Sequence, residues 1–400
     1  MPLEIQGKME AFYRTHSYLV DHVNSPVRRD LMDEIDWNDR LIGIKGTRGV
    51  GKTTFLLQYA KEKYGTDRSC LYINMNNFYF SDHSIVDFAD EFQKRGGKAL
   101  LIDQIFKYSD WSKDLHTCYN RFPDLKIVFT GSSVMRLKEE NIDLRDIAKS
   151  YNLRGFSFRE FLNFQTGMRF HAYSLEEILA DHERIAKGIS SKVQPLDYFQ
   201  DYLHHGFYPF FLEKRNFSEN LLKTMNMILE VDILLIKQIE LKYLAKIKKL
   251  FYLLAIAGSK APNVSKLAAD IRISRATVMN YIKYLTDARL INMVYHPGEA
   301  FPKKPSKVMM HNTNLMYTVY PVTVEEQDVI DTFFLNTMYK DHKLYRGGKG
   351  LSFWVDGVMP FKICCKDDKI KNDPNIKYAI HQIEIGKDNR IPLWMLGFLY

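Results

Sequence analysis

The sequence predicts an α/β fold in which a parallel sheet is followed by a helical segment and a smaller mixed region. Over roughly the first 150 residues, short apolar runs alternate with helical patterns, which is typical of parallel strands joined by helices. From about 176 to 257 the strand signals thin out and apolar residues recur at helical spacing. Residues beyond about 296 mix Pro-rich turns with strand-like runs, which lie at Phe353–Val355 and Ile380–Ile383.

The elements of the first part can be placed in order along the chain. Residues up to about Asp39 have a helical pattern that leads into the first strand. Short apolar runs then predict buried strands, with helices between them. The expected strands are Leu41–Ile44, Cys70–Met75, Lys98–Asp103 and Leu125–Gly131, and the expected helices follow Thr53 and span Trp111–Phe122.

The turn after the first expected strand has a specific pattern. Residues 46–53 read Gly-Thr-Arg-Gly-Val-Gly-Lys-Thr, which is G-x-x-x-x-G-K-[ST], the phosphate-binding P-loop. Its glycines allow backbone N–H groups to converge on phosphate oxygens at the start of a helix. No guanine-reading Asn/Thr-Lys-x-Asp motif follows, so we expect ATP with Mg²⁺. The expected nucleotide ligands are Gly46, Thr47, Arg48, Gly49, Val50, Gly51, Lys52, Thr53 and Thr54.

Asp103, at the end of its apolar run, is the expected Walker B carboxylate, and with Thr53 it is the candidate Mg²⁺ site. Many ATPases place a Glu next to hold and deprotonate the attacking water, but here the residue is Gln104. An amide holds water but takes no proton at neutral pH, so we expect binding to survive and hydrolysis to be slow. The alternative is that Asp110 or Asp114 replaces the missing base.

Hydroxyl residues lie at the end of the next expected strand. Thr130-Gly131-Ser132-Ser133 would place hydroxyls beside the γ-phosphate as a sensor, and Ser132 is the candidate. The competing interpretation is a simple polar turn after the strand.

A helix–turn–helix pattern spans 258 to about 295. Its turn ends at Ser274, the expected N-cap of the second helix, and Val278 and Ile282 fall on the core face of that helix. Outward-facing polar residues of such a helix contact phosphates or base edges of DNA, and the alternative is a packing or protein-interaction unit. The candidate DNA contacts are Arg275, Thr277, Asn280 and Lys283.

Several motifs together carry a resemblance that covers almost the whole chain. They are Gly46–Thr54, Leu101–Asp103, Tyr108 with Trp111, Phe129–Ser133, Tyr151–Phe161, His311–Leu315 and Ile391–Tyr400. In these motifs the chain resembles bacterial AAA-type ATPases that carry an AAA_14 domain and a C-terminal DUF4143 region. The resemblance implies ATP hydrolysis and a C-terminal region shaped like a PD-(D/E)xK nuclease.

The chain departs from that family where activity depends on it. Asp103-Gln104 replaces the usual Asp-Glu, and Arg145-Asp146-Ile147 replaces a Ser-Arg-Arg run, which leaves Arg145 or Arg154 as substitute arginines. In the C-terminal region Lys362 replaces the metal-binding Glu and Ser352 stands near the place of the Asp, although Asp356 remains nearby. One carboxylate does not make a divalent metal site, so nuclease activity is not expected.

Composition sets the remaining expectations. The chain has 400 residues and a formal net charge of +8, which permits a polyanionic partner without requiring one. The apolar run Leu250–Ala257 is too short to span a bilayer, and four cysteines form no C-x-x-C pair. We therefore expect a cytoplasmic protein with no membrane partner.

The sequence thus predicts four segments and one leading function. The segments are an AAA-type P-loop domain at 1–170, a helical lid or linker at 171–257, a winged helix-turn-helix at 258–300 and an inactive nuclease-like domain at 301–400. The leading hypothesis is an ATP-binding switch with slow or absent hydrolysis. The alternatives are a nucleic-acid-binding regulator and a scaffold that binds a protein partner through its C-terminal domain, and a homo-oligomer fits each of them.

Overall fold

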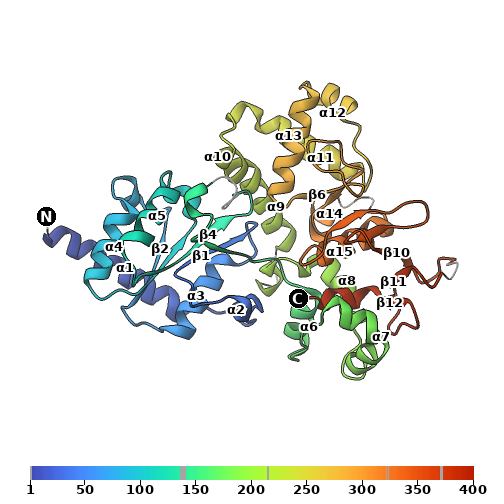
Figure 1. Cartoon of the computed structure of the whole chain (residues 1–400), viewed down its shortest axis with the longest axis horizontal. Helices are drawn as coiled ribbons and strands as arrows, with labels where there is room; N and C mark the ends of the chain where they lie inside the picture. Colours follow the sequence, from blue (N-terminus) through green and yellow to red (C-terminus); the bar gives the residue numbers. More distant parts are fainter. Residues whose placement is uncertain (1, 136–140, 214–215, 321, 323, 370–372) are drawn as a thin grey trace. The chain divides into compact units, whose positions relative to one another are not determined.

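The computed structural model divides the chain into two compact units, Met1–Arg154 and Gly155–Tyr400 (Figure 1). It describes residues 2–135, 141–213, 216–320, 322, 324–369 and 373–400. In the described residues, no helix has both the length and the apolar character needed to cross a membrane.

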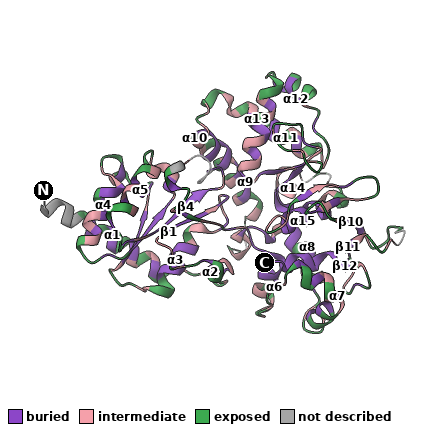
Figure 2. Cartoon of the chain, in the orientation of Figure 1, coloured by how far each residue is buried: buried purple, intermediate pink, exposed green. Residues whose placement is uncertain are grey.

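The first unit is built on a five-stranded sheet in the order β2-β3-β4-β1-β5, in which every pair of neighbours is parallel. The central strands consist almost entirely of buried residues, as Figure 2 shows for β1 and β4. Parallel strands buried on both faces read as continuous apolar runs, which is why the sequence pattern locates them well. The strands are β1 Leu41–Gly46, β2 Cys70–Asn74, β3 Ala99–Asp103, β4 Lys126–Ser132 and β5 Lys149–Asn152.

Helices connect these strands and cover the sheet. Helix α1 packs against β2 and α3, and α4 packs against α5. Aromatic rings tie α1 to α4, since the centroids of Phe12 and Phe88 lie 5.0 Å apart in an edge-to-face arrangement. The helices are α1 Pro2–His22, α2 Leu31–Glu34, α3 Lys52–Lys63, α4 Ile85–Lys94 and α5 Trp111–Arg121.

The second unit begins with helices and ends with a second sheet. Five strands lie in the order β12-β11-β10-β9-β8, with β8, β9 and β10 antiparallel and β10, β11 and β12 parallel. Helix α15, Glu326–Met338, packs against β10 and against the short helix η8, Leu393–Phe398. The strands are β8 Leu344–Arg346, β9 Phe353–Val355, β10 Met359–Cys365, β11 Lys377–His381 and β12 Arg390–Pro392.

Helices α6 to α14 make up the rest of this unit, together with a small hairpin. Helices α11, α12 and α13 pack on one another and are followed by the antiparallel strands β6 and β7. The helices are α6 Phe158–Thr166, α7 Leu175–Ser190, α8 Leu196–Asp201, α9 Phe217–Met227, α10 Leu234–Ile236, α11 Leu244–Ile256, α12 Val264–Ile271, α13 Arg275–Asp287 and α14 Thr313–Val319. The hairpin strands are β6 Ile291–Val294 and β7 Lys307–Met310.

The motif His311–Leu315 has a structural role in this unit. The amide of Asn314 donates to the carbonyl of Leu203 at 2.9 Å, and its Oδ1 accepts from the Phe207 N–H at 2.8 Å. Asn314 is fully buried, so these bonds satisfy backbone groups that a turn around residues 202–207 would otherwise bury unpaired. The motif therefore fixes the local backbone.

Most sequence expectations for the fold are confirmed. The α/β class, the parallel sheet, the helical stretch from about 176 to 257 and the Ser274 N-cap are all present, with the Ser274 side chain accepting from the Thr277 N–H. The strand expected at Ile380–Ile383 instead spans Lys377–His381. Gln382 has φ 64°, a left-handed conformation that cannot continue an extended strand.

The segment Tyr151–Phe161 spans the division between the units. Helix α6 belongs to the second unit, where it packs against η8. Its start is fixed by a capping box, in which Ser157 accepts from the Glu160 N–H and Glu160 accepts from the Ser157 N–H.

Candidate nucleotide site

The candidate site lies at the carboxyl edge of the first sheet. Because β4 pairs with both β1 and β3, the P-loop after β1 and the carboxylate at the end of β3 come to the same edge. Strand β2 adds Asn74 directly beside Asp103. Open parallel sheets bind their ligands in the crevice at this edge.

Three positions of the P-loop backbone require glycine. Gly49 and Gly51 have φ values of 86° and 94°, which residues with a Cβ rarely adopt. A Cβ on Gly46 would lie 2.5 Å from the carbonyl oxygen of Leu153, so this position also needs glycine. The loop then leads into α3, whose first residue is Lys52, and the N–H groups of that helix end can face an anion.

The ammonium group of Lys52 hydrogen-bonds to the backbone of the P-loop. Its Nζ donates to the carbonyl oxygens of Gly46 at 2.8 Å and Thr47 at 2.9 Å. Both acceptors belong to the loop itself, so the ammonium group lies among the backbone groups that would surround a phosphate chain.

Asp103 is the centre of a buried hydrogen-bond network. Its Oδ2 accepts from the hydroxyls of Thr53 at 2.7 Å and Tyr72 at 2.8 Å, and its Oδ1 accepts from the hydroxyl of Thr130. The side chain of Asp103 is buried. Burial raises the pKa of the Tyr72 hydroxyl, so Tyr72 remains a proton donor to the carboxylate.

Thr53 and Asp103 provide oxygen ligands suited to Mg²⁺. Their side-chain oxygens lie 2.7 Å apart, and hydroxyl and carboxylate oxygens are the ligands that this hard cation prefers. These two oxygen ligands therefore fit the Mg²⁺ ion that the sequence predicts.

Gln104 is held in an unusual backbone conformation next to this network. Its φ is 56°, and its N–H donates to Thr130 Oγ1 at 2.9 Å and Asp103 Oδ1 at 3.0 Å. A left-handed conformation is costly for a residue with a Cβ, and these two bonds hold it. Among the described residues, none hydrogen-bonds to the Gln104 side chain, so its amide remains available to a water molecule.

Asp110 and Asp114, the alternative bases expected from the sequence, have other hydrogen-bond partners. Asp114 is buried, and its Oδ2 accepts from the Ile85 N–H at 3.1 Å and the Tyr108 hydroxyl at 2.9 Å, which anchors the start of α4. Asp110 is exposed and accepts from Ser109. At the end of β2 the residue beside Asp103 is Asn74, a second amide.

One important contact could not be expected from the motif. Arg29 is buried, and its guanidinium donates to the carbonyl of Val50 in the P-loop at 3.3 Å and to the carbonyl of Arg154 at 2.9 Å. Arg29 therefore joins the loop to the last residue of the first unit. No local sequence signal marks it, whereas Asn74 and Thr130 are polar residues at the ends of apolar runs and were visible as such.

Two candidate catalytic residues remain predictions. Ser132 is buried, and its Oγ accepts from the Val134 N–H at 3.3 Å. Arg145 lies in an exposed turn after residues 142–144. The hydroxyl that reaches the Walker B network is that of Thr130, in the segment proposed as a sensor.

The candidate DNA contacts on α13 have different surroundings. Arg275 and Asn280 are exposed, while Thr277 is partly buried and hydrogen-bonds to the Ser274 hydroxyl. Lys283 is partly buried and forms an ion pair with Asp287, one turn further along the helix. The helical period placed Lys283 outward, but this pairing reduces its availability. Val278 and Ile282 are fully buried, as expected.

Two segments of the chain match models of known domain families. Residues 38–162 match the model of the AAA domain AAA_14. This segment is an AAA-type P-loop NTPase domain. Residues 196–326 match DUF8612, a domain of unknown function. The expectation of a DUF4143 region is therefore wrong, since His311–Leu315, one of the motifs behind the resemblance, lies inside the segment that matches DUF8612.

Two curated relatives are similar in sequence to this chain over a long stretch, and both are uncharacterized proteins of the archaeon Methanocaldococcus jannaschii. MJ1637 is 28% identical over 298 residues, which cover 70% of this chain and 62% of that protein. MJ1544 is 26% identical over 266 residues, which cover 62% of this chain and 55% of that protein. The chain thus spans about three fifths of the length of these relatives. Both come from an archaeon, so the expected bacterial family is not supported.

Several solved structures are similar to this chain, all at low TM-scores. ORC1 of Aeropyrum pernix, solved in complex with DNA, has a TM-score of 0.31 and 10% identity, covering 78% of this chain and 92% of that chain. A RuvB variant of Thermotoga maritima has a TM-score of 0.27 and 16% identity, covering 71% and 89%. AMPPCP-bound DnaA from Aquifex aeolicus has a TM-score of 0.26 and 12% identity, covering 68% and 86%.

The residues expected around a degenerate nuclease site take structural roles. Asp356 accepts from His342 Nδ1 at 2.7 Å and from the Lys343 N–H at 2.8 Å, and Ser352 Oγ accepts from the Ile363 N–H at 3.0 Å. Across the part of the chain that the structure describes, no three His, Cys, Asp or Glu side chains gather as metal ligands would. Lack of nuclease activity stays a prediction.

Proposed function

We propose that the protein binds ATP with Mg²⁺ at the P-loop and hydrolyses it slowly or not at all. The observation that carries the binding part is the junction of Lys52, Thr53 and Asp103 at one sheet edge. Lys52 would hold the β- and γ-phosphates, and Thr53 and Asp103 would hold the cation, which neutralises phosphate charge when bound.

The slow hydrolysis follows from two amides in place of a base. Gln104 and Asn74 flank Asp103, and neither side chain accepts a proton at neutral pH. Removal of a general base typically lowers a rate about 10²- to 10⁴-fold. The site would then keep ATP bound for long periods, which suits a switch better than a motor.

The switch part rests on Arg29. Its guanidinium bonds to the P-loop at Val50 and to Arg154, the last residue of the first unit. A shift of the loop on nucleotide binding would therefore act on the backbone that leads into the second unit. Such a ligand biases an equilibrium only by its differential affinity for the two states.

The test is Gln104→Glu, which restores a carboxylate beside Asp103. We expect its ATPase rate with Mg²⁺ to exceed that of the natural chain about 100-fold, with similar ATP affinity. Gln93→Glu is the matched control, because Gln93 lies on α4 near the turn that enters β3 from the opposite edge of the sheet. If Gln104→Glu leaves the rate at the level of Gln93→Glu, the missing base is not what limits hydrolysis.

We also propose that α11, α12, α13 and the hairpin β6–β7 form a winged helix. What supports this is the chain order of three helices and an antiparallel hairpin, with Lys260 bridged to Val308 at the edge of that hairpin. Residues 295–306 between β6 and β7 would then be the wing. A protein partner for the C-terminal domain and a homo-oligomer remain further proposals, for which co-purification after removal of residues beyond 295 and light scattering are the respective tests.

A further inference from the structure

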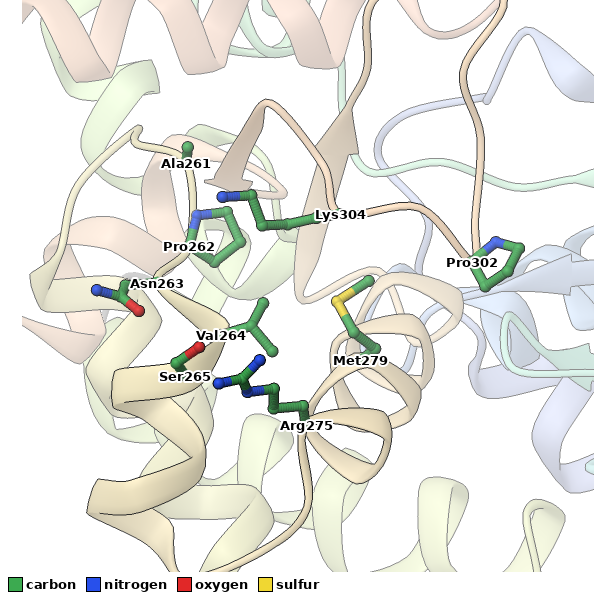
Figure 3. Close-up of a pocket in the computed structure, with 9 residues that line it drawn as sticks. All are labelled: Ala261, Pro262, Asn263, Val264, Ser265, Arg275, Met279, Pro302 and Lys304. Atoms are coloured by element: carbon green, nitrogen blue, oxygen red, sulfur yellow. The ribbon is translucent and has the colours of Figure 1, made fainter.

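A groove opens on the second unit where three segments meet. They are the start of α12, the start of α13 and the loop 295–306, and the groove has a volume of about 540 Å³. Figure 3 shows Arg275 reaching from the first turn of α13 toward Ser265, with Lys304 on the other side directed toward Pro262. The groove is lined by Ala261, Pro262, Asn263, Val264, Ser265, Arg275, Met279, Pro302 and Lys304.

The groove is positively charged. Two of its nine lining residues are basic and none is acidic. Arg275 and Lys304 are both exposed, and within the described residues neither forms an ion pair. Lys266, in the first turn of α12, is a further exposed cation next to Ser265 of this lining. Cationic side chains that form no ion pair within the described residues are available to an anionic ligand.

The rim of the groove continues onto an exposed face of α13. Ala276 and Asn280 are exposed beside Arg275, and the small side chain of Ala276 allows a partner to approach the helix closely. Helix α13 has 13 residues, so it is roughly 20 Å long at 1.5 Å per residue. The major groove of DNA, about 12 Å wide, admits a helix of this kind.

We propose that this groove and the exposed face of α13 bind duplex DNA, with Arg275 and Lys304 contacting phosphates on its backbone. The surface differs from the nucleotide site in its location, its charge distribution and its lining residues. It lies on the second unit, it presents separated charges on two segments, and its lining contains no aromatic ring to hold a single base. A repeated phosphate backbone satisfies both cations at once, while Asn280 faces the base edges. The inference goes beyond the proposed ATP binding and does not depend on it.

The test measures binding of the full chain to a fluorescein-labelled 24-base-pair duplex by anisotropy, between 50 and 300 mM salt. Each phosphate contact contributes about 0.9 to the slope of log affinity against log salt. The double variant Arg275→Ala/Lys304→Ala should therefore reduce the slope by about 1.8 and weaken binding roughly 60-fold at 0.1 M salt. The control is the double variant Lys192→Ala/Lys349→Ala, which removes two exposed lysines from other loops. It loses the same charge as the test variant, so its salt slope and DNA affinity should change only by the small effect of the lower net charge.

Several outcomes would overturn the proposal. They are no duplex binding at 50 mM salt, equal losses in the double variant and in the Lys192/Lys349 control, or tighter binding of a single strand of the same length. ATP binding by each variant is measured in parallel. Retained ATP affinity shows that the first unit is intact, and circular dichroism reports whether the second unit is folded. A loss of DNA binding is thereby separated from a failure of the nucleotide proposal.

Discussion

Replacement of Arg29 by alanine tests whether this buried residue supports the P-loop. Arg29 is 7% exposed and donates to the carbonyls of Val50 and Arg154. Hydrogen bonds from a charged donor contribute about 1.5–3 kcal/mol each. The contact to Val50, at 3.3 Å, is the longer of the two, so we assign it the lower value of about 1.5 kcal/mol.

The expected effects follow from this assignment. Arg29→Ala should lower the free energy of unfolding of the first unit by about 3 kcal/mol, the sum of two such bonds at the low end. Loss of the hydrogen bond to the Val50 carbonyl removes about 1.5 kcal/mol of support from the P-loop. This loss should weaken ATP binding about tenfold, since 1.4 kcal/mol corresponds to a factor of ten. Isothermal titration calorimetry with Mg²⁺ measures the affinity, and denaturant unfolding measures the stability.

The adjacent arginine provides the matched control. The Arg28 side chain is 45% exposed and pairs with Asp33 and Glu62 at the surface, and exposed ion pairs contribute about 0–1 kcal/mol. Arg28→Ala should therefore leave ATP affinity nearly unchanged. If Arg29→Ala and Arg28→Ala bind ATP equally well while both are folded, Arg29 does not position the loop.

Two further predictions concern the first unit. Gly46→Ala should cost about 1–3 kcal/mol and weaken ATP binding, because its Cβ would lie 2.5 Å from the Leu153 oxygen. Gly188→Ala on α7 meets nothing within 4 Å and should be neutral or stabilising by up to about 1 kcal/mol, so equal stability of the two variants would contradict the packing argument. His16 accepts from the Tyr72 N–H, and burial lowers its pKa. Its neutral form is therefore the one that stabilises the fold, and the chain should lose about 1 kcal/mol as the pH falls below about 6.5. Urea unfolding at pH 7.5 and 5.5 checks this, since His16→Gln should reduce the acid loss while the exposed His22→Gln should not.

The fold and the core of the site could be predicted because they depend on local patterns. The P-loop motif and the apolar run that ends at Asp103 each lie within a few residues of sequence. Strands β1 and β3 are buried on both faces, so each reads as a continuous apolar run. The amide of Gln104 directly after Asp103 can be read from the sequence alone, and its effect on hydrolysis stays a prediction.

The residues around Asp103 could not be predicted in the same way. Tyr72 and Thr130 reach it only because β3 lies between β2 and β4, and strand order is a property of the whole sheet. Lys283 was expected outward from its helical position, but its side chain turns to Asp287 one turn away. Arg29 acts across the first unit on backbone carbonyls, for which a sequence carries no pattern.

The central claim is that the P-loop captures ATP and leaves it intact. Its most direct test is the nucleotide content of the chain after purification with and without Mg²⁺, released by acid and separated by ion-exchange chromatography. We expect close to one ATP per chain with Mg²⁺, and loss of this ATP in Lys52→Ala. Recovery of ADP in place of ATP, or of no nucleotide in a folded chain supplied with ATP and Mg²⁺, would contradict the account.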